Sequence, residues 1–299
     1  MASNHNANPG ISRPLSGIGL MLLAMTALPI MDGIAKYLGY LLPIFMPVWA
    51  RFFFQTCLAL PLVVHQHGAK AIFAHRPLAQ ALRSLLLVSA SFCFFTALHY
   101  LPMAETVSLF FISPILVTAL SPLVLDEKYD PRRWLAVIGG FLGVLIIVRP
   151  GFAEINAGTF FGLTSGLLFA CFVLLTRRMR HVPVLLTTLY NALYGAILLT
   201  LLAPFFWAWP TPLQWLLMLS MGLISVSAQF TMVAAYQRAE ASLLAPFAYT
   251  EIIAGSIVGF IWFGDIPDHF TYVGAAILMA SGMLLSWSET RKALRKLKV

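Results

Sequence analysis

The chain has 299 residues, of which 60% are hydrophobic and only 10% are charged. A soluble domain carries about 25% charged residues, so the composition excludes a soluble globular protein and predicts a polytopic helical membrane protein. In such a chain the net charge of +8 reports orientation in the bilayer, and we expect no nucleic-acid partner.

Apolar stretches long enough to cross a bilayer follow one another with short connections. The first begins at Leu15 and is too long for the core of a removable signal peptide. A window of about 19 residues predicts ten spans, at 15–35, 41–64, 79–99, 102–125, 132–149, 157–176, 183–206, 213–236, 242–264 and 270–288.

The Lys and Arg residues are divided unequally between the two sides that ten spans define. Sixteen of the 19 lie on the side of the termini, whereas Lys36 and Arg149 lie on the other side and Arg51 lies inside a span. The positive-inside rule then predicts a multi-pass protein of a bacterial inner membrane with both termini in the cytoplasm. The N-terminal segment 1–14 and the basic tail 289–299 would flank the lipid bilayer.

The hydrophobic pattern repeats along the chain with a constant shift, which places Ala97–Ile138 on Ala235–Ala276. We call this shift the repeat offset. Each half holds five spans, an odd number, so the second half enters the membrane from the opposite side. The sequence therefore predicts an all-α integral membrane protein with two inverted five-helix repeats, 15–151 and 152–288, around a central cavity.

Span nine combines a proline with a carboxylate. Glu251 lies nine residues after Ser242, roughly halfway across a core of about 30 Å, where a charge costs on the order of 3 kcal/mol. Pro246 weakens the helix just before this carboxylate, and Tyr249 and Thr250 offer a ring and a hydroxyl. We predict that Glu251, Tyr249 and Thr250 bind a substrate; the alternative for Glu251 is a buried structural acid.

Other polar side chains inside the spans are further candidates for substrate binding. Lys36 and Arg51 would meet a substrate carboxylate, but Asp32 and Lys36, four residues apart, would equally form a structural ion pair on one helix face. Arg51 must point inward and find a partner. The remaining candidates, which would otherwise join helices or lie at the interface, are His99, Tyr190, Asn191, Gln229 and Tyr236.

Prolines break two spans that correspond under the repeat offset. Pro114 lies in span four and Pro246 in span nine, and we predict that both helices bend there and act as gates. Pairs of glycines four residues apart would let helices approach closely, or occur by chance; these are Gly139 and Gly143, Gly162 and Gly166, and Gly255 and Gly259.

Short motifs, in their order and spacing, make the chain similar to a known family. Lys36 is followed by Arg51-Phe52, Ala97–Pro102 leads into span four, Arg149-Pro150-Gly151 closes span five, and Ala241–Tyr249 opens span nine. The chain resembles the drug/metabolite transporter superfamily, ten-span type with two EamA repeats, and within it most resembles the amino acid exporters of the aromatic (YddG) type.

The resemblance implies a secondary transporter that exports amino acids, aromatic or other apolar ones favoured, and related small metabolites by alternating access. We expect it to function as a monomer. The Gly-Glu that usually closes each repeat stands here as Asp126-Glu127 and Gly264-Asp265, and the Asp at the second position favours a structural role there.

Motifs for other activities are missing from the sequence. It holds no metalloprotease, hydrolase or nucleotide-binding pattern, and His65 and His67 lack the spacing of metal ligands. We therefore expect no catalytic residue, no metal and no cofactor, and transport that uses gradients or is passive. The alternatives are an exporter of other metabolites or drugs, a nucleotide-sugar transporter or, from another class, a lipid-modifying membrane enzyme.

Overall fold

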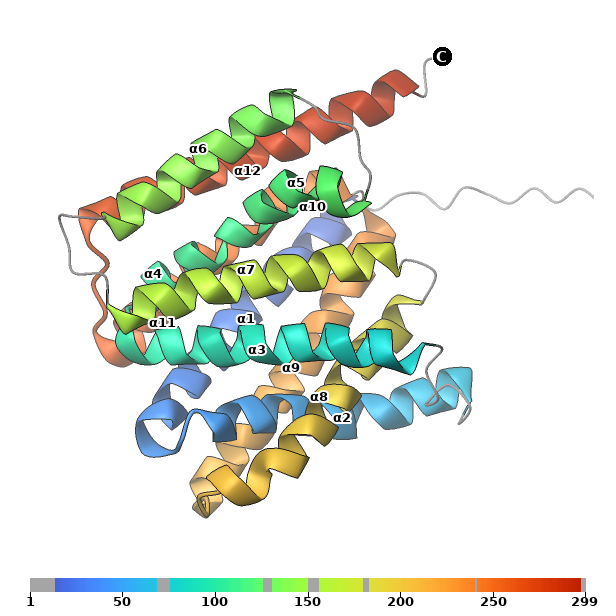
Figure 1. Cartoon of the computed structure of the whole chain (residues 1–299), viewed down its shortest axis with the longest axis vertical. Coiled ribbons are helices and arrows are strands. Elements are labelled where there is room, and N and C mark those ends of the chain that lie inside the picture. Colours follow the sequence, from blue (N-terminus) through green and yellow to red (C-terminus); the bar gives the residue numbers. More distant parts are fainter. Residues whose placement is uncertain are drawn as a thin grey trace, which may run out of the picture.

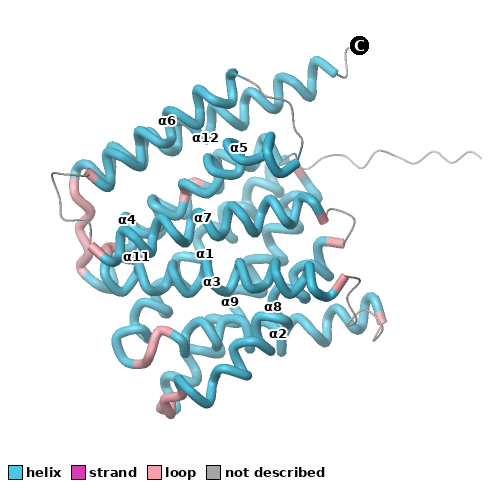
Figure 2. Tube along the Cα trace, viewed as in Figure 1, coloured by secondary structure: helices cyan, strands magenta, loops and turns pink. Residues whose placement is uncertain are grey.

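The computed structural model describes residues 14–68, 76–125, 131–149, 156–179, 183–239 and 241–296. Every regular element in these ranges is a helix, and the helices form one bundle (Figures 1 and 2). Eight stretches are long and apolar enough to cross a membrane, and two shorter apolar helices, Trp134–Val148 and His269–Leu284, complete the ten predicted spans. The all-α membrane fold is confirmed.

The helix limits fall within a few residues of the predicted spans, except at the end of the first span and where the last helix runs into the basic tail. The first half contains α1 Pro14–Leu41, α2 Phe45–His67, α3 Pro77–Tyr100, α4 Met103–Phe110, α5 Ile112–Leu125 and α6 Pro131–Val148. The second half contains α7 Ala157–Arg178, α8 Val184–Phe206, α9 Pro212–Arg238, α10 Ala241–Ala248, α11 Thr250–Phe263 and α12 His269–Lys296.

The helix limits follow the repeat offset. It carries the first and last residues of α4 and α5 onto the first and last residues of α10 and α11. The packing repeats too, because α3 packs on α7 as the equivalent α9 packs on α1, and α6 pairs with α12 (Figure 1). This exchange of partners relates the two halves by a two-fold axis, and the five spans in each half make the repeats inverted. The proposed boundary at 151 and 152 lies outside the described residues.

Two basic residues lie deeper than the sequence predicts. Helix α1 continues to Leu41, so Lys36 lies inside this helix and is buried instead of marking its outer end. Arg83, counted above among the cytoplasmic cations, is fully buried inside α3. The hydropathy window ends the first span at residue 35, just before Lys36, because a charge lowers the mean hydropathy. Arg83 lies within the predicted span 79–99, and only its assignment to the cytoplasmic side is wrong.

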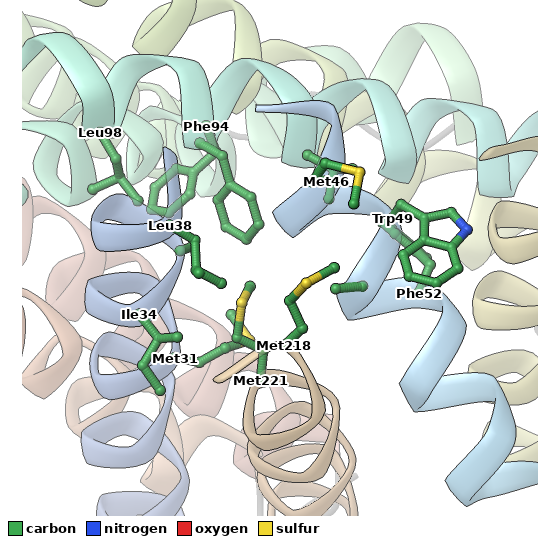
Figure 3. Packing of buried hydrophobic residues seen from close by; sticks show 14 of the residues in the cluster. Met31, Ile34, Leu38, Met46, Trp49, Phe52, Phe94, Leu98, Met218 and Met221 are labelled. Carbon is green, nitrogen blue, oxygen red and sulfur yellow. The ribbon is translucent and has the colours of Figure 1, made fainter. Parts of the chain in front are cut away.

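Helix α1 lies at the centre of the largest apolar cluster. Figure 3 shows Met31 and Leu38 of α1 facing Phe94 of α3 and Met218 and Met221 of α9. In lipid this association depends on close packing and not on exclusion of water. Asp32 and Lys36 lie on the buried face of this helix, each 3% exposed, so both point into protein and not into lipid.

The three glycine pairs all lie at helix contacts. A Cβ added to Gly143 would lie 2.9 Å from the carbonyl oxygen of Gly274 in α12, so α6 and α12 touch backbone to backbone there. The other close neighbours are Ser281 for Gly139, Leu109 for Gly162, Ile112 for Gly166, Val107 for Gly255 and Met103 for Gly259.

Spans four and nine are interrupted, though not at the prolines themselves. The breaks fall at Phe111, between α4 and α5, and at Tyr249, between α10 and α11. Pro114 accounts for the first, because its ring removes the hydrogen bond to the carbonyl of Phe110. Pro246 lies three residues before the second break and does not account for it. The second break falls at Tyr249, which is the position equivalent to Phe111 under the repeat offset. The break therefore belongs to the repeat.

The two ends of the bundle differ. At the end where α1 and α3 finish, α4 packs directly on α11 through Val107 against Gly255 and Met103 against Gly259. At the end that carries both described termini, α5 and α10 pack on other helices and make at most marginal contact with each other in the described chain. We call the first end, where α4 and α11 pack on each other, the closed end. We call the second, where the described residues of α5 and α10 do not, the parted end.

Candidate substrate-binding site

Three charged side chains from three helices, all among the described residues, lie within electrostatic range of one another inside the bundle, without forming a direct ion pair. They are Asp32 of α1, Arg51 of α2 and Glu251 of α11, and we call them the charged cluster. The guanidinium of Arg51 is close enough to both carboxylates to interact with them electrostatically. Two predicted site residues from the first half and one from the second half are thus brought together.

Two members of the charged cluster keep some exposed surface. Arg51 and Glu251 are half-buried, whereas Asp32 is buried. A charged side chain is too costly to face lipid, so we expect the exposed parts of Arg51 and Glu251 to face an opening inside the protein. Glu251 directly follows the break in span nine, so its position relative to Arg51 depends on the geometry of that break.

Arg51 has few direct partners. Its Nη1 donates to Ser91 Oγ of α3 at 3.4 Å, its guanidinium lies 5.8 Å from the ring centre of Phe95, and its Nε has no hydrogen-bond partner. A buried guanidinium nitrogen without an acceptor is costly. The free Nε is therefore available to an acceptor from a ligand.

The two break residues pack against each other with tilted rings. The rings of Phe111 and Tyr249 are 5.0 Å apart, although the sequence singled out only Tyr249. The Thr250 hydroxyl donates to the carbonyl oxygen of Phe247 across the break, so Thr250 supports the break and does not present a free donor. An aromatic pair beside the charged cluster can contact the apolar part of a ligand.

Gly282 of α12 leaves room for the Tyr249 ring. A Cβ added there would overlap Tyr249 Oη and the edge of its ring. We expect Gly282→Ala to lower the stability by about 1–3 kcal/mol through overpacking, seen as a lower thermal midpoint of the purified protein. Gly19→Ala in α1, with no heavy atom within 4 Å of the added Cβ, is the control. Equal midpoints for both variants would mean that the Tyr249 ring is not fixed.

Lys36 joins the two halves at the closed end. Its Nζ lies 2.6 Å from Asp265 Oδ2 and donates to the Leu101 carbonyl at 3.0 Å, and the Met103 N–H donates to the same Asp265 oxygen at 3.1 Å. We call these four residues the clamp. The predicted alternative pairing of Asp32 with Lys36 is therefore wrong. Lys36 binds Asp265 of the other half, and Asp32 faces Arg51.

Backbone geometry explains why Asp265 reaches Lys36. Gly264 has φ +68° and ends α11, so the chain turns back and the Asp265 N–H donates to the carbonyl of Gly259. A left-handed residue at a helix C-terminus is commonly glycine. The Asp at the end of this repeat holds the two halves together, in agreement with the structural role expected from the sequence.

A second ion pair supports the closed end. Arg149 binds Asp268, in the connection before α12. Burial raises the pKa of Asp268, but hydrogen bonds from Thr271 and the Arg149 charge outweigh this effect and hold the pKa below its ordinary value. Asp268 is therefore ionised at neutral pH, and the pair stays charged.

The remaining predicted residues lie outside the charged cluster. The His99 ring packs at a tilt against Tyr40 beside the clamp, with ring centres 5.0 Å apart. Asn191 accepts a hydrogen bond from Arg83, Tyr190 is buried in the same helix, and Gln229 is half-buried in α9. Tyr236 is 46% exposed at the end of α9, far along the helix from mid-membrane. Asp126-Glu127 and Pro150-Gly151 lie outside the described residues.

Sequence reasoning missed Ser91, Phe111 and the interior position of Arg83. Phe111 was detectable, because the repeat offset maps it onto Tyr249. Ser91 carried no signal of its own, since hydroxyl residues are frequent in membrane helices.

Comparisons with known proteins agree with this architecture. The model of the EamA-like transporter family matches residues 15–149 and 156–287. An S-adenosylmethionine uptake transporter from Rickettsia felis is 26% identical over 97% of this chain and 98% of its own. A riboflavin transporter from Vibrio cholerae is 27% identical over 95% and 97% of the two chains.

Two further similarities extend the comparison. A pseudopaline exporter from Pseudomonas aeruginosa is 25% identical over 91% of this chain and 96% of its own. A crystal structure of another protein, 17% identical, superposes with a TM-score of 0.63 over 93% of this chain and 97% of its own, which supports the fold alone.

Proposed function

Because this chain belongs to the EamA-like transporter family, we propose that it carries metabolites with an α-amino-acid group across the membrane by alternating access. The chain is a multi-pass membrane transporter for a small molecule and not an enzyme. The substrate, the side from which it is taken up and the residues that hold it are the subject of the proposal.

The observation that carries the proposal is the charged cluster of Asp32, Arg51 and Glu251. A zwitterion that leaves water must exchange its hydration for protein partners at both charges. Arg51 offers free donor capacity to a carboxylate, and Glu251 and Asp32 offer acceptors to an ammonium group. Tyr249 and Phe111 line the side where an apolar or aromatic portion would pack.

Two substrates fit this arrangement. S-Adenosylmethionine carries an α-amino-acid group, an additional positive sulfonium and an aromatic base, and the excess of one carboxylate in the charged cluster suits that extra positive charge. Several relatives are named for its uptake. An aromatic amino acid, the substrate expected from the sequence, uses the same partners without the extra charge. One relative is named for uptake and another for export, so the relatives do not indicate the direction of transport.

The orientation follows from the basic residues. We place the protein in a bacterial inner membrane with both termini on the cytoplasmic side. In that orientation the parted end faces the cytoplasm and the clamp faces outward. Moving Arg83 into the helix interior leaves 15 basic residues on the side of the termini, so the asymmetry persists. We propose that Pro114 and Pro246, next to the two breaks, let these helices flex as the gates exchange, and that a monomer suffices.

Flux into proteoliposomes tests this function. We expect S-adenosylmethionine or phenylalanine, loaded inside, to drive uptake of the same labelled compound, because exchange needs no energy source. Riboflavin, which lacks an α-amino-acid group, is the comparison substrate. Exchange of riboflavin, with neither of the other two carried, would contradict the proposed substrate class.

A further inference from the structure

A second polar group lies in the contact between α3 and α8, toward the parted end. Gln80 and Arg83 stand in the first two turns of α3, and both side chains are 0% exposed. Neither residue belongs to the charged cluster or to the clamp. They are three residues apart, so they are neighbours on the helix surface.

Arg83 is a buried cation with incomplete partners. Its Nε donates to Asn191 Oδ1 at 2.8 Å and its Nη2 to the Thr187 carbonyl at 3.2 Å, but its Nη1 has no partner. Among the described residues no carboxylate forms an ion pair with Arg83. A buried charge is costly unless a counter-ion accompanies it, so an anion that reached Arg83 would complete this group.

Gln80 adds an unpaired amide beside this cation. Neither its Nε2 nor its Oε1 has a hydrogen-bond partner. Buried polar groups are nearly always paired, and each exception calls for an explanation. Together Gln80 and Arg83 present two unpaired donor groups and one unpaired acceptor within one helical turn.

The fold itself does not require polar side chains here. The repeat offset maps Gln80 onto Met218 and Arg83 onto Met221, and both methionines are buried in the apolar cluster of Figure 3. The same helix position is thus filled by an apolar side chain in the other half. The polar pair therefore serves something other than helix packing.

Along α3 the pair lies between the parted end and Ser91, the hydrogen-bond partner of Arg51. Ser84, one turn beyond Gln80, shares its face of α3 with Ser91, and Ser91 accepts the hydrogen bond from Arg51. The rise from Ser84 to Ser91 is about 10 Å. A ligand that moves along this face from the parted end passes Gln80 and Arg83 first.

We propose that Arg83 and Gln80 form a second binding station for the α-amino-acid group, ahead of the charged cluster. The substrate carboxylate accepts from Arg83 Nη1 and Gln80 Nε2, and its ammonium group donates to Gln80 Oε1. This assignment rests on the proposed function. The atoms are closed off in the present conformation, so the station is filled when α3 and α8 separate.

Glycine is the probe, because it carries the α-amino-acid group alone. Its effect on the thermal midpoint of the purified protein would be measured in the wild type, Gln80→Met, Glu251→Gln and the double variant. Gln80→Met introduces the side chain found at the equivalent position, Met218, and breaks no hydrogen bond, so we expect this variant to fold. Arg83→Met would lose the two hydrogen bonds of Arg83 and could misfold, so it is not used. We expect Gln80→Met to weaken glycine binding at the station roughly tenfold, since two hydrogen bonds are lost, and the double variant to show almost no stabilisation.

The outcomes separate the two proposals. Equal stabilisation of the wild type and Gln80→Met overturns the station. Loss in Gln80→Met with no change in Glu251→Gln supports the station and contradicts the central site of the proposed function. If chloride stabilises the protein through Gln80 and glycine does not, the group binds inorganic anions, and the assignment to an α-amino-acid group is wrong.

Discussion

Glu251→Gln is expected to lower substrate flux at least roughly tenfold, equivalent to about 1.4 kcal/mol, while the protein folds normally. The change keeps the shape of the side chain and removes its charge, so it separates electrostatics from packing. Glu251 lies directly after the break at Tyr249 and interacts with Arg51. The Gln side chain keeps one acceptor oxygen but has no charge, so the ammonium group of the substrate loses a charged acceptor and Arg51 loses a counter-charge.

The measurement is initial flux in proteoliposomes at matched protein density, from about pH 6 to pH 8, with thermal stability followed in parallel. Ser256→Ala is the matched control, because Ser256 lies in the same helix, is half-buried and bonds only to the carbonyl of Ile252. Normal flux of Glu251→Gln over this whole range would make Glu251 structural, and binding would then depend on neutral hydrogen bonds and aromatic contacts.

Lys36→Met is the second change with a large expected effect. It leaves Asp265 with one hydrogen bond from Met103 and no counter-ion. Breaking a fully buried pair in this way costs about 3–5 kcal/mol, and we expect a smaller loss here because the Asp265 side chain is partly exposed. The clamp connects α1 to the end of α11, so we expect a lower thermal midpoint and loss of the closed outer end. Substrate flux would fall because the closed state is no longer held.

A double-mutant cycle checks this prediction. Lys36→Met combined with Asp265→Leu removes both charges, and we expect the pair of changes to cost less than their sum. Additive effects would mean that the two residues do not stabilise each other. Asp32→Asn is the control for the alternative pairing of Asp32 with Lys36. A loss of stability as large as that of Lys36→Met would indicate that Asp32 is the partner of Lys36 after all.

The fold could be predicted from the sequence because its signals are local or repeated. Apolar stretches bounded by short polar connections indicated ten spans, and the odd number of spans per half implied the inversion. The repeat offset, first visible between Ala97–Ile138 and Ala235–Ala276, holds for the limits of α4, α5, α10 and α11. These features need no knowledge of distant contacts.

The site could be predicted only in part, because its contacts join distant residues. Asp32, Arg51 and Glu251 were each recognised as charges too costly to face lipid. Their grouping was not deduced, because no spacing rule connects α1, α2 and α11. Lys36 and Asp265 are 229 residues apart, and the four-residue spacing of Asp32 and Lys36 favoured a local pair that does not form.

The clamp has a consequence for the kinetics of the cycle. The position equivalent to Lys36 is Leu174, which is buried and apolar, so the two ends close through different chemistry. Opening the clamp end means hydrating a lysine and a carboxylate, a barrier that salt lowers by screening. Leu174 brings no such charge to the other end, where we expect apolar contacts of the described residues to contribute, and sulfate and phosphate salts strengthen apolar association. We therefore expect salts to act differently on the opening of the two ends, and so on which opening limits the turnover rate.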